Sequence, residues 1–170
     1  TRPCTKHNWL VKDTNKLAET IHKAFQVAGS GRPGPVLVDV PKDVQFASGH
    51  YIKKNAIDTG FLKKEPPIDL KMLDEVIDRL EHAERPIIYS GGGVINSGQS
   101  AVHSLRNLVA GTDFPITSTL MGLGSYPASG KNWLGMLGMH GTYEANMTMH
   151  GCDFMLCIGA RFDDRITGRI

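Results

Sequence analysis

The densest group of chemically reactive side chains is the segment RFDDR, residues 161–165. It follows an apolar run, residues 154–158, and the single glycine Gly159. Guanidinium groups suit phosphate or a carbonyl-rich ring, and carboxylates suit hydroxyl groups or the same arginines. Ligands bind at the carboxyl ends of strands in open α/β sheets, so one interpretation is a ligand site. The other is a solvated loop whose charges pair with one another.

Three further segments have the composition of ligand-binding loops. The run Gly91-Gly92-Gly93 lies between an expected strand and an expected helix, where backbone N–H groups attract phosphate. It is not GxGxxG, so a conventional NAD fingerprint is absent, and a plain tight turn explains it equally well. Residues 137–141 (LGMHG) would let the backbone lie against a flat ring. His140 would be a base or a hydrogen-bond donor there, although such a histidine is more often solvated or structural. Residues 119–122 form the third loop.

Helices that would position these loops are expected throughout residues 68–170. Asp69 would cap the first one. A second would begin at Asn96 or Ser97 and end at Gly111, and a short third would be capped by Thr142.

Strands are expected at residues 85–90, 114–119 and 154–158. Because helix and strand alternate, the predicted fold is α/β, a doubly wound parallel sheet. The carboxyl ends of parallel strands meet at one edge, so all four loops would converge there. This predicts a site for an extended ligand with a phosphate part and a planar part.

A shorter α/β pattern occupies residues 1–45. Asp13 or Thr14 would cap a helix that Gly29 ends in the left-handed conformation. Its expected apolar face comprises Leu17, Ile21, Ala24, Phe25 and Ala28. Residues 35–40 would then form a strand of a parallel sheet covered on both faces. Residues 46–67 are polar and without a clear period, which predicts an interdomain linker.

The composition is that of a soluble globular protein. The 170 residues are 41% hydrophobic and 21% charged, with a net charge of +2 spread along the chain. Nothing in this pattern indicates a nucleic acid or membrane partner, and the apolar runs are too short to span a bilayer. The start of the chain, without Met or a signal-peptide core, suggests a segment of something longer. Cys4, Cys152 and Cys157 have no metal-ligand spacing, and Cys157 is expected to be a buried thiol in a reducing cytoplasm.

Several of these motifs, read together, resemble one enzyme family. They are TKHN at 5–8, GRPGPVLVDVPKD at 31–43, Gly91-Gly92-Gly93, LMGLG at 120–124, MLGMHGTYEAN at 136–146, and RFDDR at 161–165. In these motifs the chain resembles the large catalytic subunit of acetohydroxyacid synthase, also called acetolactate synthase. The resemblance runs nearly end to end, and GMLGMHGTYEANM followed by RFDDR is its most specific part.

The resemblance implies a fold, an activity and cofactors. Residues 1–45 would be the C-terminal part of a pyrimidine-binding domain, 46–67 a linker, and 68–170 a truncated central FAD-binding domain. The family condenses two pyruvates to 2-acetolactate, or pyruvate with 2-oxobutyrate, in branched-chain amino-acid biosynthesis. Thiamine diphosphate with Mg²⁺ carries the chemistry, and FAD is structural.

Some expectations follow from what the resemblance leaves outside residues 1–170. The family's catalytic glutamate and its Mg²⁺ motif would lie there, so no catalytic or metal residue is assigned here, and these residues alone should lack carboligase activity. A cytoplasmic homo-oligomer with a regulatory small subunit is also implied.

Site residues can be assigned by position in the same way. Lys42, Asp164 and Arg165 would lie near the substrate channel. Arg32, in a turn at a domain edge, would reach a cofactor on the next domain. The implied FAD contacts are Arg32, Gly91, Gly92, Gly93, Thr119, Leu120, Met121, Leu137, Gly138, Met139, His140, Gly159, Arg161, Asp163 and Arg165.

Two alternatives remain open on the sequence. One is another thiamine-diphosphate enzyme, of the glyoxylate carboligase or pyruvate oxidase type, which shares the central-domain fold. The other is a non-catalytic dinucleotide-binding module that holds NAD or FAD. The specific sequences RFDDR and GMHGTYEANM argue against the non-catalytic module.

Overall fold

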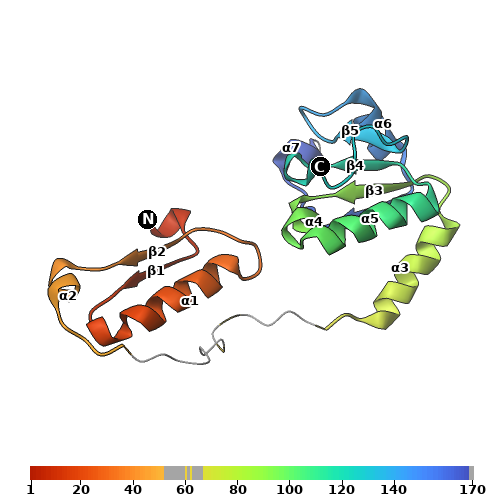
Figure 1. The fold of residues 1–170 in the computed structure, drawn as a ribbon. Coiled ribbons are helices and arrows are strands. Elements are labelled where there is room, and N and C mark those ends of the chain that lie inside the picture. Colours follow the sequence, from red (N-terminus) through yellow and green to blue (C-terminus); the bar gives the residue numbers. More distant parts are fainter. Residues whose placement is uncertain (52–59, 61, 63–66, 169–170) are drawn as a thin grey trace. The chain divides into compact units, whose positions relative to one another are not determined.

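The computed structural model describes residues 1–51, 60, 62 and 67–168. The chain divides into two compact units, Thr1–Pro67 and Ile68–Ile170 (Figure 1). Most of the linker predicted over residues 46–67 lies outside the described residues. The domain assignments made from the resemblance stay predictions.

The first unit is a parallel strand pair with one long helix. Strand β1 (His7–Leu10) pairs with β2 (Val36–Asp39), and α1 (Leu17–Gly29) connects them and packs on both. The short helices are η1 (Arg2–Cys4), η2 (Thr14–Lys16) and α2 (Lys42–Phe46). Asp13 caps η2 by accepting a hydrogen bond from the Asn15 N–H. The predicted parallel pairing is therefore confirmed. The predicted cap is displaced, because Asp13 caps η2, which leads into α1, whereas α1 itself begins after Lys16 without a side-chain cap.

In this unit one strand was not predicted, and two expectations were wrong. Strand β1 was not predicted, because its sequence HNWL has no apolar run or alternation. The left-handed glycine is Gly31, with φ of +52°, and not Gly29. Of the expected apolar face of α1, Ala24 is buried but Phe25 is 77% exposed. The described residues therefore cover only part of that face.

The second unit is a four-stranded parallel sheet in the order β5-β4-β3-β6. Its strands are β3 (Pro86–Ser90), β4 (Ile116–Ser118), β5 (Trp133–Met136) and β6 (Phe154–Ile158). Its helices are α3 (Leu70–His82), α4 (Gly92–Asn96), α5 (Gln99–Thr112), α6 (Tyr143–Gly151) and α7 (Asp164–Thr167), with the turn η3 (Leu120–Gly122). Helices α3 and α6 are capped by Asp69 and Thr142 as predicted.

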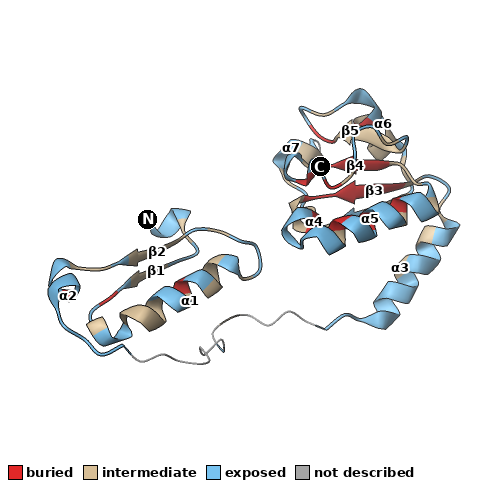
Figure 2. Ribbon diagram, in the orientation of Figure 1, coloured by how far each residue is buried: buried red, intermediate tan, exposed pale blue. Residues whose placement is uncertain are grey.

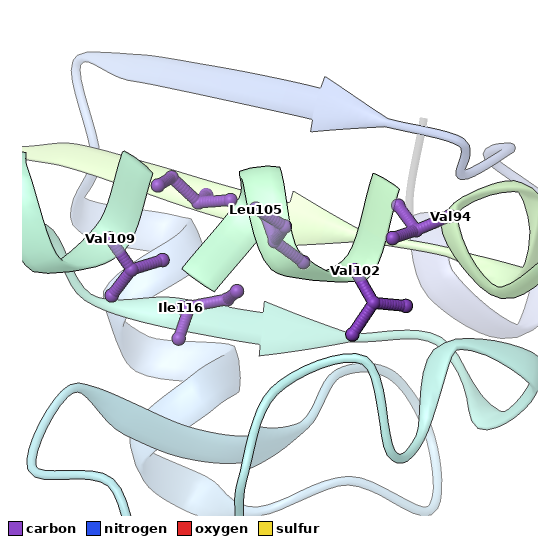
Figure 3. Packing of buried hydrophobic residues seen from close by; sticks show 6 residues of the cluster. Val94, Val102, Leu105, Val109 and Ile116 are labelled. Atoms are coloured by element: carbon purple, nitrogen blue, oxygen red, sulfur yellow. The ribbon is translucent and has the colours of Figure 1, made fainter. Parts of the chain in front are cut away.

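The core lies on both faces of this sheet, which confirms the predicted doubly wound α/β class. On one face, Val102, Leu105 and Val109 of α5 pack against Ile88 and Ile116 (Figure 3). On the other face, Tyr89 packs with Leu137 after β5 and Ala145 of α6. Residues Ile87 to Ser90 of β3 are fully buried, so the central strand organises both layers (Figure 2).

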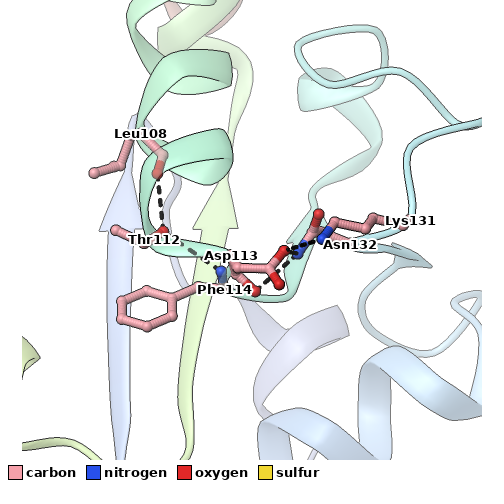
Figure 4. A network of polar contacts seen from close by, with 6 residues as sticks. All are labelled: Leu108, Thr112, Asp113, Phe114, Lys131 and Asn132. Carbon is pink, nitrogen blue, oxygen red and sulfur yellow. Dashed lines mark hydrogen bonds and ion pairs between the residues drawn. The ribbon is translucent and has the colours of Figure 1, made fainter.

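Both boundaries of α5 differ from the predicted ones, and polar contacts account for the C-terminal one. The helix begins after Gly98, beyond Asn96 and Ser97, and it continues through Gly111 to Thr112. Asp113, in the left-handed conformation with φ of +58°, ends it. Asn132 Nδ2 donates to the Asp113 carbonyl at 2.8 Å, and Lys131 pairs with its carboxylate at 2.8 Å (Figure 4). These contacts hold a conformation that aspartate tolerates better than most residues.

In this unit one strand was not predicted, and one prediction failed. Strand β5 was not predicted, because Gly135, with φ of +91°, interrupts its sequence WLGM. Cys157 is exposed and not buried, since β6 lies at an edge of the sheet. Among the described residues, no helix combines the length and apolar character needed to cross a membrane.

Truncating the α5 core should be costly. Leu105 is 3% exposed, so we expect Leu105→Ala to lower the free energy of unfolding by about 3 kcal/mol. Leu70 of α3 is 68% exposed, so Leu70→Ala should cost less than about 1 kcal/mol. Urea unfolding followed by circular dichroism measures both. Equal losses in the two variants would contradict this assignment of the core.

Candidate functional site

The four glycine and arginine loops all follow parallel strands at one edge of the second sheet. The Gly91-Gly92-Gly93 run follows β3, the η3 loop follows β4, residues 137–141 follow β5, and residues 159–165 follow β6. Backbone hydrogen bonds continue into the loops: Thr119 N–H donates to the Ser90 carbonyl at 2.9 Å, and Leu137 N–H to the Ser118 carbonyl at 3.0 Å. The predicted convergence at the carboxyl edge is therefore observed.

The glycine run packs against the chain's own backbone. A Cβ atom on Gly91 would lie 2.2 Å from the Gly159 carbonyl oxygen, and one on Gly93 would lie 2.7 Å from Gly159 Cα. Gly91 N–H donates to the Ile158 carbonyl and Gly93 N–H to the Gly159 carbonyl, both at 2.9 Å. The glycines are thus needed for a close crossing of two loops, and at most the Gly92 amide is left for a ligand.

The charges of RFDDR are only loosely paired with one another. Arg161 Nη2 lies 3.7 Å from Asp163 Oδ2, and Arg165 Nε lies 3.7 Å from Asp164 Oδ2. Both distances exceed those of normal hydrogen bonds. The side chains of Arg161 and Arg165 are 69% and 64% exposed. Exposed pairs of this kind contribute little, so both guanidinium groups can still bind an anion.

Asp163 has a structural task within the same segment. Its Oδ1 accepts a hydrogen bond from the Arg165 N–H at 3.1 Å, and its side chain thereby caps α7. Asp164, the first residue of α7, is exposed. The two carboxylates therefore differ, since one fixes the backbone and the other faces solvent.

The loop after β5 contacts α7 directly. Met139 N–H donates to the Arg165 carbonyl at 2.9 Å, and Arg165 Nη1 lies 3.9 Å from Met139 Sδ. Leu137 and Gly138 are buried beneath this contact, whereas Met139 and His140 are exposed. The structure thus joins the loop of Met139 to the loop of Arg165.

Large apolar side chains are exposed on the loops of this edge. Leu120 and Met121 of η3 are 67% and 73% exposed, Met139 is 66% exposed and Phe162 is 54% exposed. Thioether and aromatic groups pack well on flat rings, and guanidinium groups bind phosphate. The edge therefore carries both kinds of group that a dinucleotide requires.

Tyr89 is a residue of this region that sequence reasoning missed. Its ring lies 5.7 Å from the Phe162 ring, centroid to centroid, beneath RFDDR. Burial raises the pKa of its hydroxyl to about 12, with smaller contributions from Asp163 and Cys157. That hydroxyl is buried with no hydrogen-bond partner among the described residues. The strand PIIYS gave no signal for this role, because the contact with Phe162 is not local.

Arg32 and Lys42 belong to the first unit, where both are exposed. Arg32 lies in the turn before β2, and Lys42 begins α2. Their roles in FAD binding and in the substrate channel stay predictions.

Comparison with known proteins gives consistent matches. Residues 73–170 match the family described as thiamine pyrophosphate enzyme, central domain. The chain is 43% identical to the acetolactate synthase large subunit of Parasynechococcus marenigrum (strain WH8102), covering 100% of this chain and 28% of that protein. It is 40% identical to the acetolactate synthase isozyme 3 large subunit of Escherichia coli (strain K12), covering 99% and 29%.

A plant protein matches over the same extent. The probable acetolactate synthase 2, chloroplastic, of Oryza sativa subsp. japonica is 44% identical, covering 100% of this chain and 25% of that protein. The chain therefore spans between 25% and 29% of the length of these three relatives.

The glycine crossing should tolerate no side chain. We expect Gly91→Ala to lower the free energy of unfolding by about 3 kcal/mol, because the new methyl group would meet Gly159 backbone atoms. Gly111 lies within α5 with nothing within 4 Å of an added Cβ, so Gly111→Ala should raise stability by about 0.5–1 kcal/mol. Urea unfolding of both variants tests this pair. A Gly91→Ala variant as stable as the wild type would show that the crossing is not tight.

Ionisation of Tyr89 should destabilise the fold. Its folded-state pKa of about 12 exceeds the unfolded value near 10, so its contribution is fully present below pH 10 and is lost as the pH rises through 12. Tyr89→Phe should match or exceed wild-type stability at pH 7, since it removes an unpartnered buried hydroxyl. Its advantage should grow above pH 10, as measured by urea unfolding at pH 7 to 11.

Tyr143, which is 75% exposed, provides the matched control. Tyr143→Phe should follow the wild type over the same pH range. Parallel stability curves for wild type and Tyr89→Phe above pH 10 would contradict the burial of that hydroxyl.

Proposed function

We propose that the chain, which belongs to the thiamine pyrophosphate enzymes through their central domain, is part of an acetolactate synthase large subunit. The proposed reaction condenses two pyruvates to 2-acetolactate, or pyruvate with 2-oxobutyrate. The observation that carries this proposal is the similarity along the whole chain, across both units, to large subunits of that name. A similarity confined to the central domain would not distinguish this enzyme from other thiamine enzymes.

The proposal assigns FAD binding to the carboxyl edge of the second sheet. Arg161 and Arg165 offer exposed guanidinium groups for the diphosphate. Leu120, Met121 and Met139 offer exposed apolar surface for a flat ring. Since two of the three glycine amides at Gly91 to Gly93 are already bonded, the arginines would supply most of the anion binding.

Thiamine diphosphate, once bound, supplies the carbanion stabilisation that joins two keto acids. Its site and that of Mg²⁺ are assigned to other parts of the protein. Among the described residues, no three His, Cys, Asp or Glu side chains are grouped as metal ligands. The task proposed for this chain is to hold FAD and to form part of the substrate channel.

The first unit completes the proposal. Residues 1–45 would belong to the pyrimidine-binding domain, and Arg32 would contact FAD from there. Lys42, Asp164 and Arg165 would line the substrate channel. A homo-oligomer of catalytic subunits with a regulatory small subunit, in the cytoplasm, is the assembly proposed.

Titration of the purified chain with FAD, followed by flavin fluorescence, tests the cofactor assignment, with NAD as the competing ligand. We expect saturable binding of FAD in preference to NAD. Arg161→Ala should weaken FAD binding roughly 10- to 100-fold, because it removes a charge-assisted hydrogen bond to phosphate.

Arg79→Ala is the matched control. It removes an equal charge from the last turn of α3, which leads to the amino end of β3 and not to the carboxyl ends of the strands, and it should leave the affinity for FAD unchanged. Equal affinity for NAD and FAD, or no effect of Arg161→Ala, would contradict the assignment.

A further inference from the structure

We propose that Asn146 of α6 is the positioning residue that sets Met139 and Arg165 at the carboxyl edge of the sheet. It is half-buried, and its side chain acts from behind the loop rather than on the ligand. The inference deepens the proposed function, because the expected effect of Asn146 on FAD affinity rests on the proposed FAD site. The contacts that carry it belong to the chain alone.

The side-chain amide of Asn146 bonds to both backbone groups of one loop residue, Gly138. Its Oδ1 accepts from the Gly138 N–H at 3.1 Å, and its Nδ2 donates to the Gly138 carbonyl at 3.1 Å. Because the Gly138 N–H can only donate, the orientation of the Asn146 amide is fixed. A third bond, from Nδ2 to the Thr142 carbonyl at 2.8 Å, ties the same group to the start of α6.

Gly138 in turn determines where α7 lies. Its φ is +105°, and an added Cβ would lie 2.6 Å from Ile166 Cδ1 and 2.8 Å from the Arg165 carbonyl oxygen. The next residue, Met139, donates its N–H to that same carbonyl at 2.9 Å. A shift of Gly138 would therefore displace both the exposed Met139 side chain and the backbone of Arg165.

Only an amide satisfies all the groups at this position. Aspartate would still accept from the Gly138 N–H, but it would place a carboxylate against the carbonyls of Gly138 and Thr142. Leucine would leave all three backbone groups without this partner. The bond to the Thr142 carbonyl alone would only stabilise the start of α6. The two bonds to Gly138, eight residues away, connect Asn146 to the loop that carries Met139.

Amide hydrogen exchange and FAD titration of the full chain, carrying Asn146→Leu or Asn146→Asp, test the proposal. In Asn146→Leu, we expect protection of the Met139 N–H to fall at least about tenfold relative to that of Ile88, whose N–H bonds Pro115 in the core. The affinity for FAD should fall roughly tenfold. Asn146→Asp, which keeps one of the Gly138 bonds, should give intermediate values for both.

Asn132→Leu is the matched control. The Asn132 side chain also bonds to the backbone, at Asp113, but it does so at the amino ends of the strands. It should change neither the Met139-to-Ile88 ratio nor the affinity for FAD. Unchanged Met139 protection in Asn146→Leu, an equal loss in Asn132→Leu, or an unchanged FAD affinity would overturn the proposal. If the wild type binds no FAD, the proposed cofactor fails, and Met139 exchange alone then decides the role of Asn146.

Discussion

The second unit depends on a close crossing of two loops at the ends of β3 and β6. Gly91 and Gly93 meet Gly159 so closely that any side chain at these positions would collide with backbone. Hydrogen bonds from Gly91 and Gly93 to the carbonyls of Ile158 and Gly159 fix the crossing. Since β3 is the buried centre of both core layers, this contact determines where RFDDR leaves the sheet.

The crossing also limits how this edge can recognise a ligand. In a GxGxxG loop, free amides at a helix start bind the diphosphate. Here two of the three glycine amides are bonded to the chain, and α4 spans only Gly92–Asn96. The proposed site would therefore rely on side chains, with Arg161 and Arg165 for charge and the exposed apolar groups of η3 and residues 137–141 for a ring.

Local patterns were enough to predict most of the second unit. Capping residues such as Asp69 and Thr142, and the apolar run of β3, act within a few residues. The failures have non-local causes. Strand β5 exists because it pairs with β4, and α5 passes Gly111 because Asn132 and Lys131 hold Asp113. The position of the four loops at one edge could be predicted, because each follows a parallel strand. The contacts of Tyr89 with Phe162 and of Asn146 with Gly138 could not be predicted, since no local pattern marks them.

Contacts with neighbouring loops explain how the backbone that carries the exposed Arg161 and Arg165 is held in place. The loose ion pairs within RFDDR cannot order the side chains, because solvent screens them. The backbone is instead held at three points: at Gly159 by the glycine run, at the Arg165 N–H by the Asp163 carboxylate, and at the Arg165 carbonyl by the Met139 N–H. The Phe162 ring also packs against Tyr89. A backbone that is already ordered loses less conformational entropy when a ligand binds. Less of the binding free energy of the guanidinium groups is then needed to offset that loss. The backbone of a segment that resembles a self-paired surface loop is thus held in place, which suits the anion-binding role proposed for it.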